Sequence, residues 1–163
     1  MKTNKIAFLG LLVALAFVLS YVEMLLPISI GIPGAKIGLA NLVVMVALYT
    51  IGPKNAFILS IVRVVLVGFT FGNMAMMIYS MAGAMLSFVA MIIGKKTKLF
   101  SITGVSVLGG VFHNVGQIIV AIIALDAASL VYYFPFLVVI GTISGIVIGI
   151  VSGMITERIK VTF

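Results

Sequence analysis

The chain has 163 residues, a mean hydropathy of +1.43 and only 8% charged residues. Soluble domains carry about 25% charged residues, so the composition excludes an ordinary soluble fold. It predicts an all-α polytopic membrane protein with a single integral membrane domain over residues 1–163. The chain has no cysteine, which excludes disulfides and thiolate metal sites, and no metal or cofactor is predicted.

Apolar runs separated by turn or charge signals divide the chain into six predicted membrane helices. The first resembles a signal peptide, but its apolar run is long and no small-residue cleavage site follows it. The second and third are short for a hydrocarbon core of about 30 Å. The sixth begins near Pro135, a residue that a first helical turn tolerates. The predicted helices are approximately 5–25, 36–51, 55–71, 74–94, 101–125 and 134–157.

The basic residues predict the orientation of these helices. Six spans place eight of the ten basic residues on one side of the membrane, with Lys36 on the other side and Arg63 inside. Because basic loops face the cytoplasm, both termini are predicted to be cytoplasmic, in a bacterial-type plasma membrane. Topology thus explains the net charge of +7, and nucleic-acid binding loses its support.

Arg63 lies in the middle of the apolar run Asn55–Asn73. An arginine at the centre of a membrane helix costs about 2.5–3.5 kcal/mol on insertion scales. We therefore expect Arg63 to face the protein interior or a water-filled cavity, with an anionic partner. That partner is either Glu23 or a bound ligand.

The densest polar cluster lies in the predicted helix 101–125. His113 and Gln117 share one helix face, which Asn114 adjoins. Two interpretations remain open: interhelical hydrogen bonds, or contact with a ligand or gate. Lys36 and Arg63 could together attract an anionic solute. The candidate substrate-binding residues are Glu23, Lys36, Asn41, Arg63, Asn73, Tyr79, His113, Asn114 and Gln117.

Small residues recur at helical spacing in two predicted helices. In the last helix, glycines at 141, 145, 149 and 153 form a ridge that allows close helix packing. Packing within the monomer is the default interpretation of this ridge. Ala7, Gly10 and Ala14 form a shorter small-residue face on the first helix. That face is a candidate for docking a partner, with internal packing as the alternative.

Motifs typical of enzymes are missing. The three acidic residues, Glu23, Asp126 and Glu157, are far apart in sequence, so no paired carboxylates could hold magnesium and diphosphate. There is also no phosphate loop and no serine–histidine–aspartate pattern. We therefore expect a non-enzymatic protein, and any transport would need energy from a partner or an ion gradient.

Four stretches in order along the chain carry a resemblance to a known family. They are PGAKIGLAN (Pro33–Asn41), IVRVVLVGFTFGN (Ile61–Asn73), YSMAGAMLS (Tyr79–Ser87) and GVSVLGGVFHNVGQ (Gly104–Gln117). The chain resembles the Gx transporters, which are often labelled heptaprenyl diphosphate synthase component I. The resemblance implies a six-helix bundle similar to the S components of energy-coupling factor (ECF) transporters. Such S components bind a vitamin or precursor, dock on a membrane T component in part through small residues of their first helix, and rely on two ATPases for release.

Two functions follow as expectations. The first is a substrate-binding subunit of an ECF-type importer for a small vitamin-like molecule, anionic or amphipathic, with a T component and ATPases as partners. The second is a non-catalytic membrane anchor of a prenyl, quinone or flavin redox complex. An ion-coupled transporter acting alone is disfavoured, because the sequence shows no membrane-embedded carboxylate relay and no evident inverted repeat.

Overall fold

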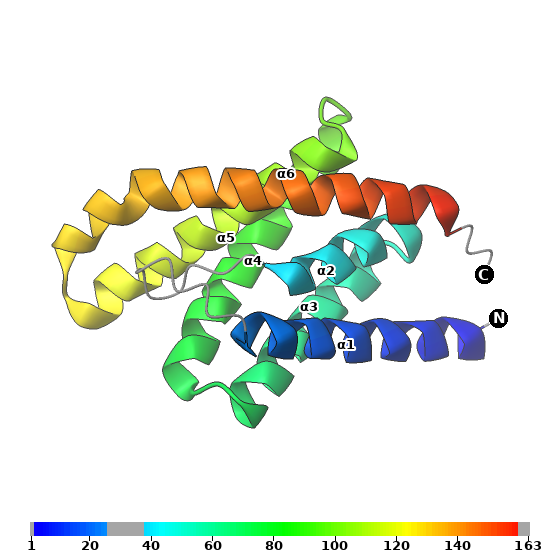
Figure 1. The fold of residues 1–163 in the computed structure, drawn as a ribbon, viewed down its shortest axis with the longest axis horizontal. Coiled ribbons are helices and arrows are strands. Elements are labelled where there is room, and N and C mark those ends of the chain that lie inside the picture. The colour runs from blue at the N-terminus through cyan, green and yellow to red at the C-terminus, as the bar shows by residue number, and fades with distance from the viewer. Residues whose placement is uncertain (1, 26–37, 160–163) are drawn as a thin grey trace.

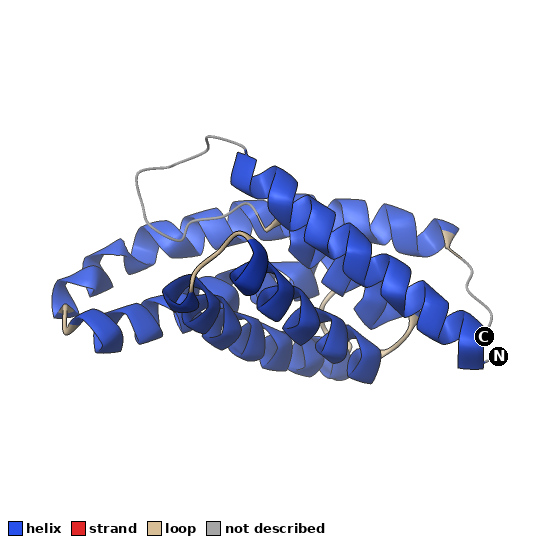
Figure 2. Cartoon of the chain, turned by 90° about the horizontal axis from the view of Figure 1, so that it is seen from below, coloured by secondary structure: helices blue, strands red, loops and turns tan. Residues whose placement is uncertain are grey.

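The computed structural model describes residues 2–25 and 38–159, which form six α-helices and one short 3₁₀ helix (Figure 1). In chain order they are α1 (Lys2–Leu25), α2 (Leu39–Thr50), α3 (Pro53–Thr70), α4 (Met74–Thr97), α5 (Ile102–Leu125), η1 (Ala128–Tyr133) and α6 (Phe134–Arg158). The N-terminal end of α1 and the C-terminal end of α6 lie at the same end of the molecule (Figures 1 and 2).

Local signals explain where several helices begin. The Asn73 side chain accepts a hydrogen bond from the Met76 backbone N–H, and the Ser101 hydroxyl accepts one from Gly104 N–H. Both residues are therefore N-caps, which satisfy a backbone donor that the first turn leaves unpaired. Pro53 and Pro135 lie in the first turns of α3 and α6, where a missing N–H costs no helical hydrogen bond.

The observed bounds differ from the predicted ones mainly at α1, which begins at Lys2, and at α2 and α4. Helix α4 continues through Lys95 and Lys96 to Thr97 and ends at Lys98, whose φ is 57°. The sequence predicted an end at residue 94, but lysines are good helix formers and are favoured in a last turn by the helix dipole. Helix α2 begins at Leu39, after Gly38 in a left-handed conformation with φ 78°.

Five of the α-helices are long and apolar enough to cross a membrane, so the chain is a multi-pass membrane protein. Helix α2 is the exception among the described residues. Its 12 residues span only about 18 Å at 1.5 Å per residue. It cannot cross a hydrocarbon core of about 30 Å by itself. The sequence predicted a short helix over 36–51 here, and the structure makes it shorter still.

Helices α4, α5 and α6 pack through glycines. A Cβ on Gly110 of α5 would lie 2.4 Å from the carbonyl oxygen of Gly141 on α6, and one on Gly145 would lie 2.6 Å from the Cα of Val107. Only glycine allows backbones to approach so closely. The predicted packing role of the α6 ridge is confirmed for Gly141, Gly145 and Gly149, whereas a Cβ on Gly153 would meet nothing within 4 Å.

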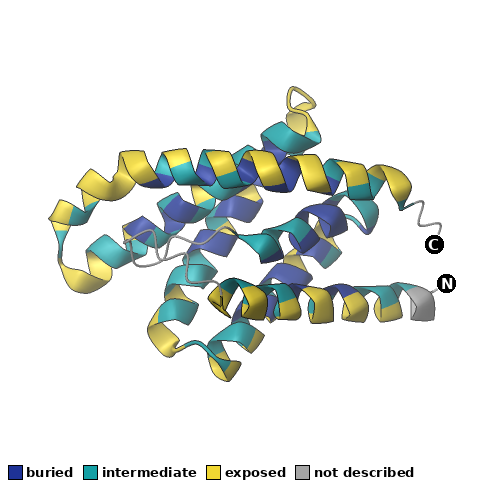
Figure 3. Cartoon of the chain, in the orientation of Figure 1, coloured by how far each residue is buried: buried dark blue, intermediate teal, exposed yellow. Residues whose placement is uncertain are grey.

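Helices α1, α2 and α3 pack through larger side chains. Helix α2 contacts α1, α3 and α6, and seven of its twelve residues are buried. The largest fully buried side chains include Met45 and Leu48 of α2 and Leu59 of α3. Figure 3 shows this buried centre, with exposed residues along the outer faces of α1 and α6. Exposed apolar side chains on those faces suit contact with lipid.

Candidate solute-binding site

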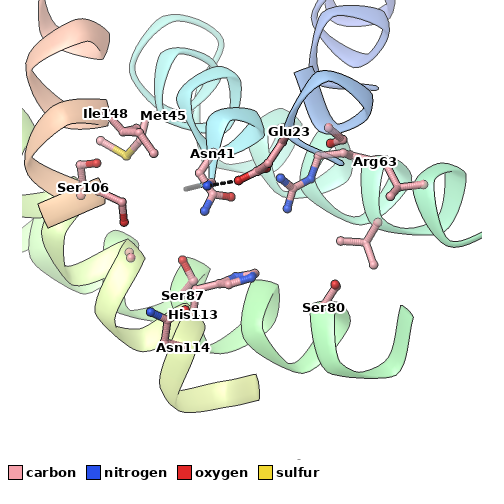
Figure 4. Close-up of a pocket in the computed structure, with 18 of the residues that line it drawn as sticks. Glu23, Asn41, Met45, Arg63, Ser80, Ser87, Ser106, His113, Asn114 and Ile148 are labelled. Atoms are coloured by element: carbon pink, nitrogen blue, oxygen red, sulfur yellow. Dashed lines mark hydrogen bonds between the residues drawn. The ribbon is translucent and has the colours of Figure 1, made fainter. Parts of the chain in front are cut away.

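A cavity of about 70 Å³ lies where α2 begins, which is enough space for several water molecules. All six α-helices contribute to its wall. In Figure 4, Glu23, Asn41 and Arg63 lie on one side of the cavity, and Ser87, His113 and Asn114 lie on the other. Met45, Ser106 and Ile148 complete one end. The cavity therefore lies between the side-chain-packed helices and the glycine-packed helices.

Arg63 is buried in α3, with 8% of its surface exposed, and it borders the cavity. Glu23, in the last turn of α1, also borders the cavity and interacts favourably with the Arg63 charge. Within residues 2–25 and 38–159, no hydrogen bond or ion pair at 4 Å or less joins Arg63 to another residue. Its guanidinium group therefore has donors available to the cavity.

Glu23 is held by the start of α2. Its carboxylate accepts a short hydrogen bond from the backbone N–H of Gly38. The N-terminal end of a helix carries a partial positive charge, so this position stabilises the carboxylate independently of Arg63. A Cβ on Gly38 would lie 3.1 Å from the Asn41 side chain and 3.5 Å from Ile148. Glycine is favoured here chiefly because the backbone of Gly38 is left-handed, with φ 78°.

Helix α5 contributes His113 and Asn114 to the cavity wall. The Asn114 amide donates to the carbonyl oxygen of Leu137 on α6 at 2.8 Å, in buried surroundings. This is the interhelical hydrogen bond that the sequence left open as one of two interpretations. The His113 backbone and ring pack against Gly83 of α4. Asn114 thus joins α5 to α6 while the same residue borders the cavity.

The remaining predicted site residues lie elsewhere. Asn73 is exposed and caps α4, Tyr79 does not border the cavity, and Gln117 packs against Gly83. Lys36 lies outside the described residues. The structure therefore brings Glu23, Asn41, Arg63, His113 and Asn114 together and separates them from Asn73, Tyr79 and Gln117.

Sequence reasoning missed several serines and methionines of the cavity wall. Ser87 and Ser106 are both buried, and Met45 and Met91 border the same space. The sequence pattern around Ser87 and Ser106 could have indicated their position. Each serine lies one or two turns from a glycine on the same helix face, which is typical of a close helix contact with a polar lining. The methionines carry no such signal, since apolar helices use methionine in many environments.

The family model described as "Heptaprenyl diphosphate synthase component I" matches residues 12–155. The match spans every helix of the cavity wall. It confirms the family resemblance that the four ordered stretches indicate. No curated protein and no solved structure matches the chain.

Proposed function

Because the chain belongs to the heptaprenyl diphosphate synthase component I family, we propose that it is the solute-binding membrane subunit of an ECF-type importer. The observation that carries the proposal is a buried arginine beside a cavity inside a membrane helix bundle. Intramembrane charges are expensive, and they mark substrate pathways more often than packing sites. The cavity gives Arg63 a space in which a solute can reach it.

The proposed solute is a small, anionic or amphipathic, vitamin-like molecule. Arg63 offers several fixed N–H donors, and the α2 N-terminus adds a partial positive charge at the same cavity. Glu23 offsets part of this charge, so a solute with both polar and apolar portions fits better than a simple inorganic anion.

We propose a non-catalytic role, although the family description contains the word synthase. Prenyl transfer needs carboxylates that hold magnesium and diphosphate. The whole sequence has three acidic residues, and Glu23, Asp126 and Glu157 lie in α1, at the C-terminal end of α5 and near the C-terminal end of α6. No group of three or more His, Asp or Glu side chains suited to a metal ion occurs in the described part of the chain.

The proposed topology places both termini in the cytoplasm of a bacterial-type cell. Lys95 donates from Nζ to the carbonyl oxygen of Leu48 at 2.6 Å, so the C-terminal ends of α4 and α2 lie together. Lys54, Lys96 and Lys98 follow these ends closely in sequence. A basic cluster on one side of the membrane supports the cytoplasmic assignment of that side.

The proposed partners are a membrane T component and two ATPases, with α1 as the docking helix. Ala7, Gly10 and Ala14 are exposed on α1, and a Cβ on Gly10 would meet nothing within 4 Å. A small-residue face without an internal partner allows close approach of another membrane helix. Replacing Gly10 and Ala14 with leucine should weaken copurification of the T component and ATPases without changing solute binding. Unchanged copurification would contradict the docking assignment.

Saturable binding to detergent-purified protein tests the solute-binding role. The assay uses a solute identified in the purified protein by mass spectrometry. Arg63→Ala should abolish binding while the thermal unfolding transition stays cooperative. Gly153→Ala is the matched control, because this helix substitution meets no neighbouring atom. Normal binding by the Arg63→Ala protein would rule out the proposed site.

A second candidate is a non-catalytic membrane subunit of a prenyl, quinone or flavin redox complex. The description of the family as a synthase component favours it. Copurification with a prenyl synthase or a flavoprotein, in place of a T component and ATPases, would support this candidate over the importer.

A further inference from the structure

Two buried serines face the cavity from the glycine-packed helices. Ser87 of α4 and Ser106 of α5 are each 4% exposed, and both border the cavity. In Figure 4, the Ser87 side chain lies across the cavity from Asn41, and the Ser106 side chain lies on the same side as Met45. Their hydroxyl groups are therefore removed from bulk solvent and adjoin the space available to a solute.

The hydroxyls of Ser87 and Ser106 lack hydrogen-bond partners within the described residues. By contrast, Ser20 donates to Ala16 O at 2.8 Å, and Ser152 donates to Ile148 O at 2.6 Å. Both oxygens of Ser87 and Ser106 are open to the cavity and are not sealed inside the protein, so water or a bound solute can pair with them there. Two hydroxyls without a partner among the described residues, at one cavity, are placed to hydrogen-bond a solute that enters it.

The surroundings of these hydroxyls select against charge. Met45, Met91, Gly109 and Ile148 border the same cavity, and none of them can neutralise an ion. The charged side chains among the described wall residues, Glu23 and Arg63, come from α1 and α3. His113 of α5 is the one further titratable residue among them and lies beside Ser87 in Figure 4. An unpaired charge beside the serines would be strongly disfavoured. Thioethers accommodate rings and apolar groups of varied shape.

We propose that Ser87 and Ser106, called here the hydroxyl wall, bind an uncharged hydrogen-bonding group of the same solute that meets Arg63. This inference rests on the proposed function and deepens it. The solute class is a molecule with a charged group at one side and an uncharged hydroxyl, amide or ring heteroatom at the other. The hydroxyl wall then determines which of several similarly charged solutes is accepted.

Single cysteines test the hydroxyl wall, because the chain contains no cysteine of its own. Ser87→Cys and Ser106→Cys are nearly isosteric, and Ser152→Cys is the matched buried control. The probes are uncharged methyl methanethiosulfonate and its anionic sulfonatoethyl and cationic trimethylammonioethyl analogues. Each reagent's rate with a cavity cysteine is divided by its rate with a small thiol in solution. We expect this normalised rate to be more than tenfold higher for the uncharged reagent than for either charged reagent, at both cysteines. The Ser152→Cys protein should stay unmodified.

A second pair of reagents tests hydrogen bonding. The 2-hydroxyethyl and propyl methanethiosulfonates are both uncharged and similar in size. In the Ser87→Cys protein, one hydrogen bond to Ser106 should favour the hydroxyethyl reagent about fivefold. In the double variant Ser87→Cys with Ser106→Ala, the two reagents should react at equal rates.

Equal reactivity toward charged and uncharged reagents, or a hydroxyethyl preference that survives Ser106→Ala, would overturn the hydroxyl wall. These outcomes do not depend on solute binding at Arg63. Failure of the Arg63→Ala binding experiment would instead reject the proposed function.

Discussion

The helices that carry the charges of the cavity are packed differently from those that carry its hydroxyls. Helices α5 and α6 meet backbone to backbone at Gly110, Gly141 and Gly145, and α4 and α5 do so at Gly83 and Gly116. Helices α1, α2 and α3 meet through large side chains such as Met45 and Leu59. Backbone contacts leave little freedom to shift, whereas side chains can change rotamer. We infer that the first group forms a rigid wall and the second is the adjustable side of the cavity.

The largest expected effect comes from adding one methyl group to the rigid wall. Gly110→Ala would place a carbon 2.4 Å from the Gly141 carbonyl oxygen. Because neither backbone can yield alone, α5 and α6 must separate, and we expect a loss of about 3 kcal/mol or more in the free energy of unfolding. Denaturant unfolding in detergent measures this loss. Gly153→Ala, with no neighbour within 4 Å, should leave stability unchanged or slightly raised, and similar losses in both proteins would contradict the rigid wall.

On the adjustable side, Glu23→Gln should have the next largest effect. Arg63 then loses its negative neighbour, while the Gln side chain can still accept the hydrogen bond from Gly38. Removing one partner of a dry buried pair costs about 3–5 kcal/mol. Because both residues border a cavity, we expect a loss of about 2 kcal/mol in the free energy of unfolding. The double variant Glu23→Gln with Arg63→Gln should cost less than the sum of the single variants, and strict additivity would show that the two charges do not interact.

Asn114→Ala tests the hydrogen bond within the rigid wall. The substitution removes the donor to the Leu137 carbonyl oxygen. Interhelical side-chain hydrogen bonds in membrane proteins contribute about 0.6 kcal/mol on average and up to about 1.7, so we expect a loss of about 1 kcal/mol. Thr142→Val is the control, since that hydroxyl donates within its own helix to Val138. A loss as large as that of Gly110→Ala would mean that polar contacts, and not close glycine packing, stabilise this half.

The smallest effect is expected at one polar contact between the two halves. Lys95 of α4 donates to Leu48 of α2 and lies 4.3 Å from the centre of the Tyr49 ring. Lys95→Met should lower the free energy of unfolding by about 0.5–1 kcal/mol, because a cation over an aromatic ring near solvent contributes little. The exposed Lys96→Met is the control, and thermal unfolding of both proteins gives the comparison. No difference between them would show that this contact does not join the halves.

The rigid half was largely predictable from the sequence, and the cavity was predictable only in part. Glycines every four residues indicate close packing wherever they meet a partner, and apolar length alone identifies the long helices. The sequence indicated that α2 is short but not that it begins at Leu39, because hydropathy does not report where a helix starts inside a bundle. Ser87 and Ser106 were not predicted as cavity residues, since small residues at helical spacing are read first as a packing face and a helical serine usually bonds its own backbone. Only the packing of α4 against α5 shows that these two do not.

The central claim is that Arg63 faces a solute across the cavity. Native mass spectrometry of the gently solubilised protein tests it most directly, in the wild type and in Arg63→Gln. The account predicts one small molecule per chain on the wild type and none on the variant, with Gly153→Ala matching the wild type. Equal occupancy of the wild type and the Arg63→Gln protein would contradict it.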